Sequence, residues 1–147
     1  MAVILIVACV LVLLAVFWIR RARARREIEE HSISPEALHG LLASDRGVLI
    51  YDVRLPLDLL ADSEIIPGAN RVAPHEVEAN PALIPREKDV VVYCTCPSDE
   101  TSRSILLKAR SHGFSRIKFL KGGLEGWKAK GFAVEPYTDT FRLDSGA

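Results

Sequence analysis

The chain begins with a long apolar run. From Ala2 to Ile19, eighteen residues carry no charge, no Gly and no Pro. As a helix rising about 1.5 Å per residue, this run would be roughly 27 Å long, close to the roughly 30 Å thickness of a bilayer's hydrocarbon core. The sequence therefore predicts a single transmembrane anchor over residues 1–19, in contact with the lipid bilayer through residues 2–19. Cys9 lies within this run.

The charges that follow the run indicate its orientation. A secretory signal peptide would have positive charge before the apolar run and small residues at a cleavage site after it. Here the positive charge comes after the run, and in membrane proteins it concentrates on the cytoplasmic side. We expect a single-pass protein of the cell membrane whose globular part faces the cytoplasm, with a membrane protein as an open candidate partner. The charges are Arg20, Arg21, Arg23, Arg25 and Arg26.

The rest of the chain has the length of one compact domain. We expect a charged spacer helix over 20–31, a domain over 32–135 and a tail over 136–147. The 19 basic and 19 acidic residues balance, but without the five arginines 14 basic residues face 19 acidic ones, a balance of −5. This balance argues against nucleic acid as a partner.

Within the domain, strand and helix patterns alternate. Ser34 before Pro35 is typical of a helix start. Short apolar runs at 48–51, 90–93 and 117–120 predict buried strands, and residues 102–112 have helical spacing and end at Gly113. The pattern predicts an α/β fold with a parallel sheet, whose carboxyl edge is where ligands bind.

Two cysteines lie between the second strand and the helix that follows it. Cys94 and Cys96 would face unpaired backbone N–H groups and the positive end of a helix, which lower the pKa of a thiol and make the thiolate nucleophilic. The competing interpretation is that both are small buried hydrophobic residues. Because two of only three cysteines occur in one turn, we favour thiol chemistry.

Several segments of the domain carry a further signal through their residues and their order along the chain. They are Leu49–Arg54, Ile66–Ala69, Val91–Cys94, Gly113-Phe114 and Leu120–Trp127. In these segments the chain resembles rhodanese-like sulfurtransferase domains. The resemblance implies an open parallel β-sheet flanked by helices, and one cysteine that carries sulfane sulfur as a persulfide. It implies a sulfane-sulfur donor and a thiol acceptor as partners, no cofactor, and structural roles for Asp52, Arg54, Gly122, Gly123 and Trp127.

The predicted active-site loop departs from the family pattern, which has a basic residue near its end. With Cys96 as the nucleophile, the loop has the family length and Ser102 opens the helix; with Cys94, the position directly after the strand fits but the loop is two residues too long. We favour Cys96, with Cys94 within reach, and leave the assignment open. The rest of the loop is Pro97, Ser98, Asp99, Glu100, Thr101 and Ser102.

The charges and the proline in this loop affect which sulfur donor can bind. Pro97 removes one N–H donor, and Asp99 and Glu100 repel an anion, so thiosulfate is disfavoured as the sulfur donor. A phosphatase reaction is disfavoured too, because the loop lacks a phosphate-binding arginine at its end.

Two other functions stay open. Cys94 and Cys96 could form a module that binds a soft metal ion or undergoes redox change, although two thiolates are an incomplete zinc site and we assign no metal site. The domain could also be a catalytically idle scaffold at the membrane, since fold resemblance does not establish activity.

Overall fold

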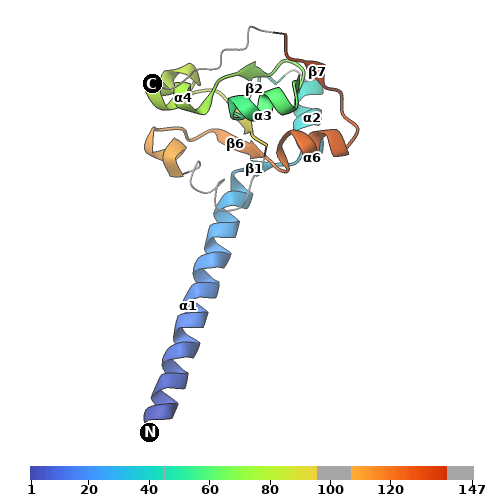
Figure 1. Cartoon of the computed structure of the whole chain (residues 1–147). Coiled ribbons are helices and arrows are strands. Elements are labelled where there is room, and N and C mark those ends of the chain that lie inside the picture. The colour runs from blue at the N-terminus through green and yellow to red at the C-terminus, as the bar shows by residue number, and fades with distance from the viewer. Residues whose placement is uncertain (45, 96–106, 139–147) are drawn as a thin grey trace.

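The computed structural model describes residues 1–44, 46–95 and 107–138, and the side chains of residues 2–5 are not among the described features. Its centre is a five-stranded parallel sheet in the order β1-β6-β5-β2-β4 (Figure 1). The strands are β1 (Ser32–Ile33), β2 (Leu49–Asp52), β4 (Asn70–Arg71), β5 (Val90–Tyr93) and β6 (Ile117–Leu120).

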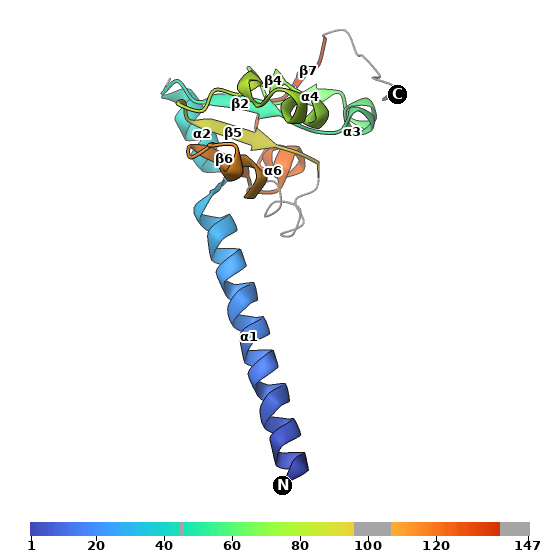
Figure 2. The same cartoon turned by 90° about the vertical axis from the view of Figure 1, so that its left-hand side faces the viewer.

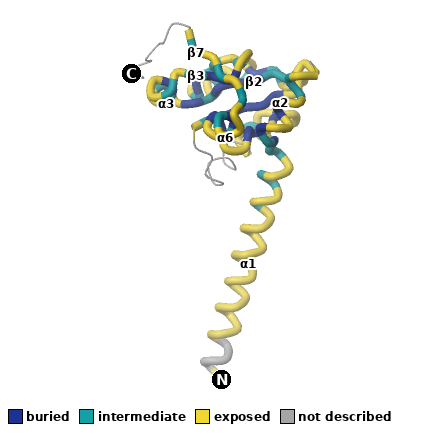
Figure 3. The backbone as a smooth tube through the Cα atoms, turned by 90° about the vertical axis from the view of Figure 1, so that its right-hand side faces the viewer, coloured by how far each residue is buried: buried dark blue, intermediate teal, exposed yellow. Residues whose placement is uncertain are grey.

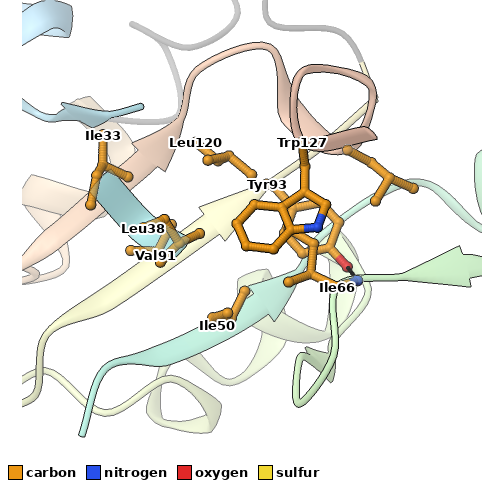
Figure 4. Close-up of a cluster of buried hydrophobic side chains, with 9 residues drawn as sticks. Ile33, Leu38, Ile50, Ile66, Val91, Tyr93, Leu120 and Trp127 are labelled. Carbon is orange, nitrogen blue, oxygen red and sulfur yellow. Dashed lines mark hydrogen bonds between the residues drawn. The ribbon is translucent and has the colours of Figure 1, made fainter. Parts of the chain in front are cut away.

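Helical segments cover both faces of the sheet. On one face, α2 (Pro35–Ala43) and α6 (Gly123–Ala129) enclose a first hydrophobic cluster, which includes Leu38, Tyr93 and Trp127 (Figure 4). On the other face, α4 (Pro74–Ala79), the 3-10 helix η1 (Pro81–Leu83) and helical residues 107–111 lie over a second cluster. The predicted α/β class with a parallel sheet flanked by helices is confirmed.

Strand β5 is the central element of the sheet. All four of its residues are buried, and it pairs with β2 on one side and β6 on the other. A strand buried on both faces needs a continuous apolar run, which Val90, Val91 and Val92 supply. The predicted strands at 90–93 and 117–120 are confirmed, and the one expected at 48–51 lies one residue further along, at Leu49–Asp52.

Helix α2 begins as the sequence predicts. The Ser34 side-chain oxygen accepts a hydrogen bond from the Ala37 N–H at 3.2 Å, and Pro35 takes the first helical position. The predicted helix over 102–112 is observed over 107–111, and residues 102–106 lie outside the described part of the chain.

Shorter elements were not predicted. They are α3 (Pro56–Ala61), α4, η1, the two-residue strands β1 and β4, and an antiparallel pair formed by β3 (Glu64–Ile65) and β7 (Glu135–Pro136). The three helical elements have only three to six residues, too few for a helical period to be visible, and each has Pro at its start.

The N-terminal segment is one continuous helix, α1 (Ala2–Glu30), which projects from the domain (Figures 2 and 3). Its last turn is joined to the sheet, because the Phe119 N–H donates to the His31 carbonyl oxygen at 2.8 Å. Ion pairs of Glu27 with Arg110 and of Glu29 with Lys121 add to this junction. The spacer predicted over 20–31 is thus helical up to residue 30, as an extension of the N-terminal helix.

Across the described residues, no helix combines the length and the apolar content that crossing a membrane requires. The expected transmembrane span over residues 2–19 is therefore not supported by the structure, although most of the large apolar side chains described in α1 are exposed.

We predict that Leu38→Ala destabilises the domain. Leu38 is fully buried in the first cluster, and truncating such a leucine leaves a cavity that typically lowers the free energy of unfolding by about 2–5 kcal/mol. The matched control is Leu57→Ala, since Leu57 is 72% exposed and its truncation should change that free energy by about 0.5 kcal/mol or less. Urea denaturation of both variants measures the difference, and equal effects would contradict the packing described.

Candidate active site

Cys94 lies directly after β5, at the carboxyl edge of the sheet, and its side chain is partly buried. The ends of β2 and β6 flank it, because Tyr93 is paired with Asp52 and Val92 with Phe119. This is the edge where open parallel sheets bind ligands. The location predicted for Cys94 is therefore observed. The remaining predicted loop residues, Cys96, Pro97, Ser98, Asp99, Glu100, Thr101 and Ser102, lie outside the described residues, and their roles stay predictions.

The main chain at Cys94 is in tight contact with the turn between β6 and α6. A Cβ atom placed on Gly123 would lie 2.0 Å from the Cys94 carbonyl oxygen, which no side chain can tolerate. Gly123 also has a φ of +56°, and Gly122, which precedes it, has a φ of +73°, a region that glycine adopts without a steric penalty. The resemblance implies structural roles for both glycines, and the structure shows that Gly123 permits the close approach of the Cys94 main chain.

A buried ion pair lies at the adjacent end of β2. Arg54 Nε lies 3.0 Å from Asp52 Oδ1 and 2.9 Å from Oδ2, and Arg54 Nη2 donates to Asp52 Oδ2 at 2.6 Å. The Arg54 N–H also donates to Asp52 Oδ1 at 3.0 Å. Both side chains are essentially inaccessible to solvent. Asp52 and Arg54, for which the resemblance implies structural roles, therefore form a buried ion pair.

The guanidinium of Arg54 connects this pair to the chain that follows α3. Its Nη1 donates to the Asp62 carbonyl oxygen at 2.9 Å and its Nη2 to the Glu64 carbonyl oxygen at 2.8 Å. Burial alone would lower the pKa of Arg54, but the hydrogen bonds and the charge of Asp52 raise it, so the group stays cationic. The pair therefore fixes the end of β2 to β3.

Tyr93 links the same network to the cysteine. Its hydroxyl accepts a hydrogen bond from the Ile66 N–H at 3.2 Å (Figure 4), and the Arg54 guanidinium carbon lies 5.9 Å from the centre of its ring. Burial, and then the Asp52 carboxylate, raise the pKa of Tyr93, so the phenol stays neutral. The residue before Cys94 is thus held by both packing and a hydrogen bond.

Sequence reasoning missed the roles of Tyr93 and Arg71. The signal for Tyr93 was a hydroxyl-bearing residue that ends an otherwise aliphatic strand, next to the cysteine. Arg71 ends β4, and its Nη1 donates to the Asp52 carbonyl oxygen at 3.4 Å. No strand was predicted at residues 70–71, because two residues do not form a recognisable pattern, so no feature of the sequence indicated a role for Arg71.

A metal site was not assigned from the sequence. Within 1–44, 46–95 and 107–138, no group of three or more His, Cys, Asp or Glu side chains is placed to hold a metal ion. The described residues at this sheet edge therefore offer one thiol, a rigid main chain and a buried ion pair.

Comparison with known proteins defines the class of this fold and site. The family model for the rhodanese-like domain matches residues 34–130, and this chain belongs to that family. A protein named sulfurtransferase from Allochromatium vinosum is 29% identical over 104 residues, which cover 71% of this chain and 94% of that protein.

Solved structures with similar folds agree with this assignment. The Alr3790 protein from Anabaena sp. has a TM-score of 0.59 at 27% identity, covering 71% of this chain and 82% of that one. A protein from Lactobacillus plantarum has a TM-score of 0.66 at 22% identity, covering 80% of this chain and 97% of that one. The second likeness concerns the fold alone.

We predict that Gly123→Ala moves the Cys94 main chain and destabilises the domain. The matched control is Gly131→Ala, because Gly131 also has a left-handed φ, of +72°, but has open space around its Cα. Both substitutions incur the roughly 1–2 kcal/mol conformational cost of that backbone region, and only Gly123→Ala adds the steric clash. Thermal unfolding and the rate of Cys94 alkylation, followed by peptide mass spectrometry, should change more in Gly123→Ala. Equal changes would show that the close contact has no consequence.

We also predict that Asp52→Asn is strongly destabilising. It leaves the Arg54 cation buried without its counter-charge, which typically costs about 3–5 kcal/mol. Asp89→Asn is the control, since the Asp89–Arg116 pair is about half exposed on both sides, and such pairs contribute about 0–1 kcal/mol. Chemical denaturation of the two variants distinguishes them, and a small effect of Asp52→Asn would contradict the role of the pair.

Proposed function

We propose that this chain is a rhodanese-type sulfurtransferase that carries sulfane sulfur as a persulfide on the Cys94–Cys96 pair. The observation that carries the proposal is the placement of Cys94 at the carboxyl edge of a rhodanese-like sheet, with its main chain packed on Gly123. The name of the relative from Allochromatium vinosum, sulfurtransferase, is consistent with this activity.

The proposed reaction has two steps. A cysteine thiolate attacks the outer sulfur of a donor R–S–S⁻, forms a new S–S bond and releases the thiolate R–S⁻; the enzyme then holds Cys–S–S⁻. An acceptor thiolate attacks the outer sulfur of this persulfide, takes it away, and regenerates the cysteine thiolate. Fixed backbone N–H groups around the cysteine would stabilise the anion in both steps. We assign the first attack to Cys96.

The second cysteine permits another route. The Cys94 thiolate can attack the inner sulfur of a Cys96 persulfide, which releases hydrosulfide and leaves a Cys94–Cys96 disulfide that a thiol reductant reopens. Cysteines two residues apart are near the upper limit of disulfide geometry, so this bond would be strained and easily reduced. Such a bond suits a repeated catalytic cycle better than it suits stabilisation of the fold.

We propose the class of sulfur donor from the charge of the residues that follow the cysteines. Asp99 and Glu100 follow the cysteines directly in the sequence, and two carboxylates near a thiolate disfavour the approach of a dianion such as thiosulfate. A neutral or protein-bound persulfide suits this loop better.

We further propose that α1 attaches the domain to the cell membrane, with the domain on the cytoplasmic side. Exposed apolar side chains from Ile6 to Ile19 and the arginines that follow support this proposal. An exposed apolar surface of this size on a single projecting helix is unfavourable in water, and lipid would cover it.

The first test uses the full chain with Cys9→Ser as background. After incubation with cysteine persulfide or thiosulfate, peptide mass spectrometry should find one added sulfur on Cys96 with cysteine persulfide and little with the dianion thiosulfate. Cys96→Ser should abolish the adduct, and Cys94→Ser should retain it in a single turnover because it leaves the nucleophile in place.

Other results would reassign the site. An adduct that survives Cys96→Ser and is lost in Cys94→Ser would make Cys94 the nucleophile. Absence of any sulfur adduct would contradict sulfur transfer; if Cu(I) or Zn²⁺ then bound in a cysteine-dependent way, a metal module would be indicated, and otherwise a scaffold.

The membrane proposal has its own prediction. Leu11→Arg with Leu14→Arg should release the protein from the membrane fraction, because each change places a charge on the exposed apolar surface of α1 that lipid would cover. The control is Leu57→Arg, an exposed position in α3, which should stay in the membrane fraction. Retention of the double variant, or digestion of the domain by protease added outside intact cells, would contradict the proposal.

A further inference from the structure

The second face of the sheet contains a cavity of about 150 Å³. Its floor is formed by side chains that lie in the strands or close to their ends, among them Val53, Val92, Phe114 and Ile117. Its walls come from α4 and η1 on one side and from helical residues 107–111 on the other, two segments that Figure 1 draws on the same side of the sheet. The cavity therefore lies inside the second cluster, on the opposite face from α2 and α6.

The side chains that line the cavity determine which class of molecule can bind in it. The residues deep in it are aliphatic or aromatic, such as Val92, Ile84 and Phe114, all of them buried. A water molecule is held firmly only where two or more polar groups can bind it, and an apolar cavity of about 150 Å³ in another protein accepts benzene. The space suits an apolar molecule about as large as a benzene ring.

Among the described lining residues, the polar side chains are those of Glu78, Lys108 and His112, and all three are exposed. Lys108 and Glu78 form an ion pair that joins the 107–111 segment to α4, and both side chains are more than half exposed. Since the pair is neutral as a whole, it does not select a charged ligand. An exposed ion pair contributes little stability, about 0–1 kcal/mol, so it can open and close at small cost as a ligand enters.

From this arrangement we propose that the cavity is a binding site for a small, uncharged, largely apolar molecule, such as a substituted benzene. The site is separate from the cysteines, and the proposal does not depend on sulfur transfer. The cavity nevertheless extends to the ends of β2 and β5, close to Cys94. Val92, which lines the cavity, lies two residues before Cys94. Val53, which also lines it, donates its N–H to the Tyr93 carbonyl oxygen at 3.0 Å.

The test uses the full chain and toluene as the probe. Toluene close to its aqueous solubility should raise the Tm by a few degrees, because a ligand that binds only the folded state stabilises it. In a methyl ¹³C–¹H spectrum, the signals of Val53, Val77 and Val92 should shift on addition of toluene. Signals of valines outside the cavity, such as Val134, should not.

A cavity-filling variant separates binding from a general solvent effect. Ala109→Leu places three more carbon atoms at the cavity wall and should abolish both toluene effects without lowering the Tm. Ala37→Leu makes the same change at an exposed helical position and should keep both effects. Val77→Leu fills the cavity from α4 and replaces Ala109→Leu if that variant does not fold.

Three results would overturn the proposal. The first is the absence of any toluene effect on the Tm and the methyl signals of the natural chain. The second is an equal toluene effect in the natural chain and the cavity-filling variant, which would indicate a solvent effect only. The third is a large loss of stability in both Ala109→Leu and Val77→Leu, because overpacking would mean that the space is already filled.

Discussion

The arrangement of the candidate site depends on the buried ion pair between Asp52 and Arg54. Removing both charges from water is costly, and the cost is offset only when the hydrogen bonds are nearly complete. Here the carboxylate receives donors from the arginine side chain and main chain, and the guanidinium reaches the Asp62 and Glu64 carbonyl oxygens. One pair therefore fixes the end of a central strand and the segment that leads to β3.

The main chain of Cys94 is positioned indirectly by this network. Tyr93 contacts Arg54 through its ring and binds the Ile66 N–H through its hydroxyl, and Cys94 is the next residue. From the other side, the Cys94 carbonyl oxygen occupies the space that a side chain at position 123 would need, and Gly123 leaves that space open. A reactive thiol needs such a fixed surrounding, because stabilisation of charge depends on dipoles that are already oriented.

Most of the sheet could be predicted from the sequence, because strands buried on both faces are continuous apolar runs such as Val90–Tyr93. The position of the cysteine turn followed from the alternation of strand and helix. The α3 and α4 helices could not be predicted, since six residues do not establish a period. The neighbour of Gly123 could not be identified either, because the contact with Cys94 joins residues 29 positions apart. The choice between Cys94 and Cys96 depends on residues outside those described.

The two edges of the sheet have a consequence for how copies of this protein behave when they are crowded together. Both edge strands, β1 and β4, contain only two residues. A long edge strand offers a row of unpaired N–H and C=O groups on which a second chain can add as a new strand, and such additions lead to aggregation. Strands this short provide almost no template. If a membrane confines many copies to one plane, their sheets can collide edge to edge and separate again without fusing.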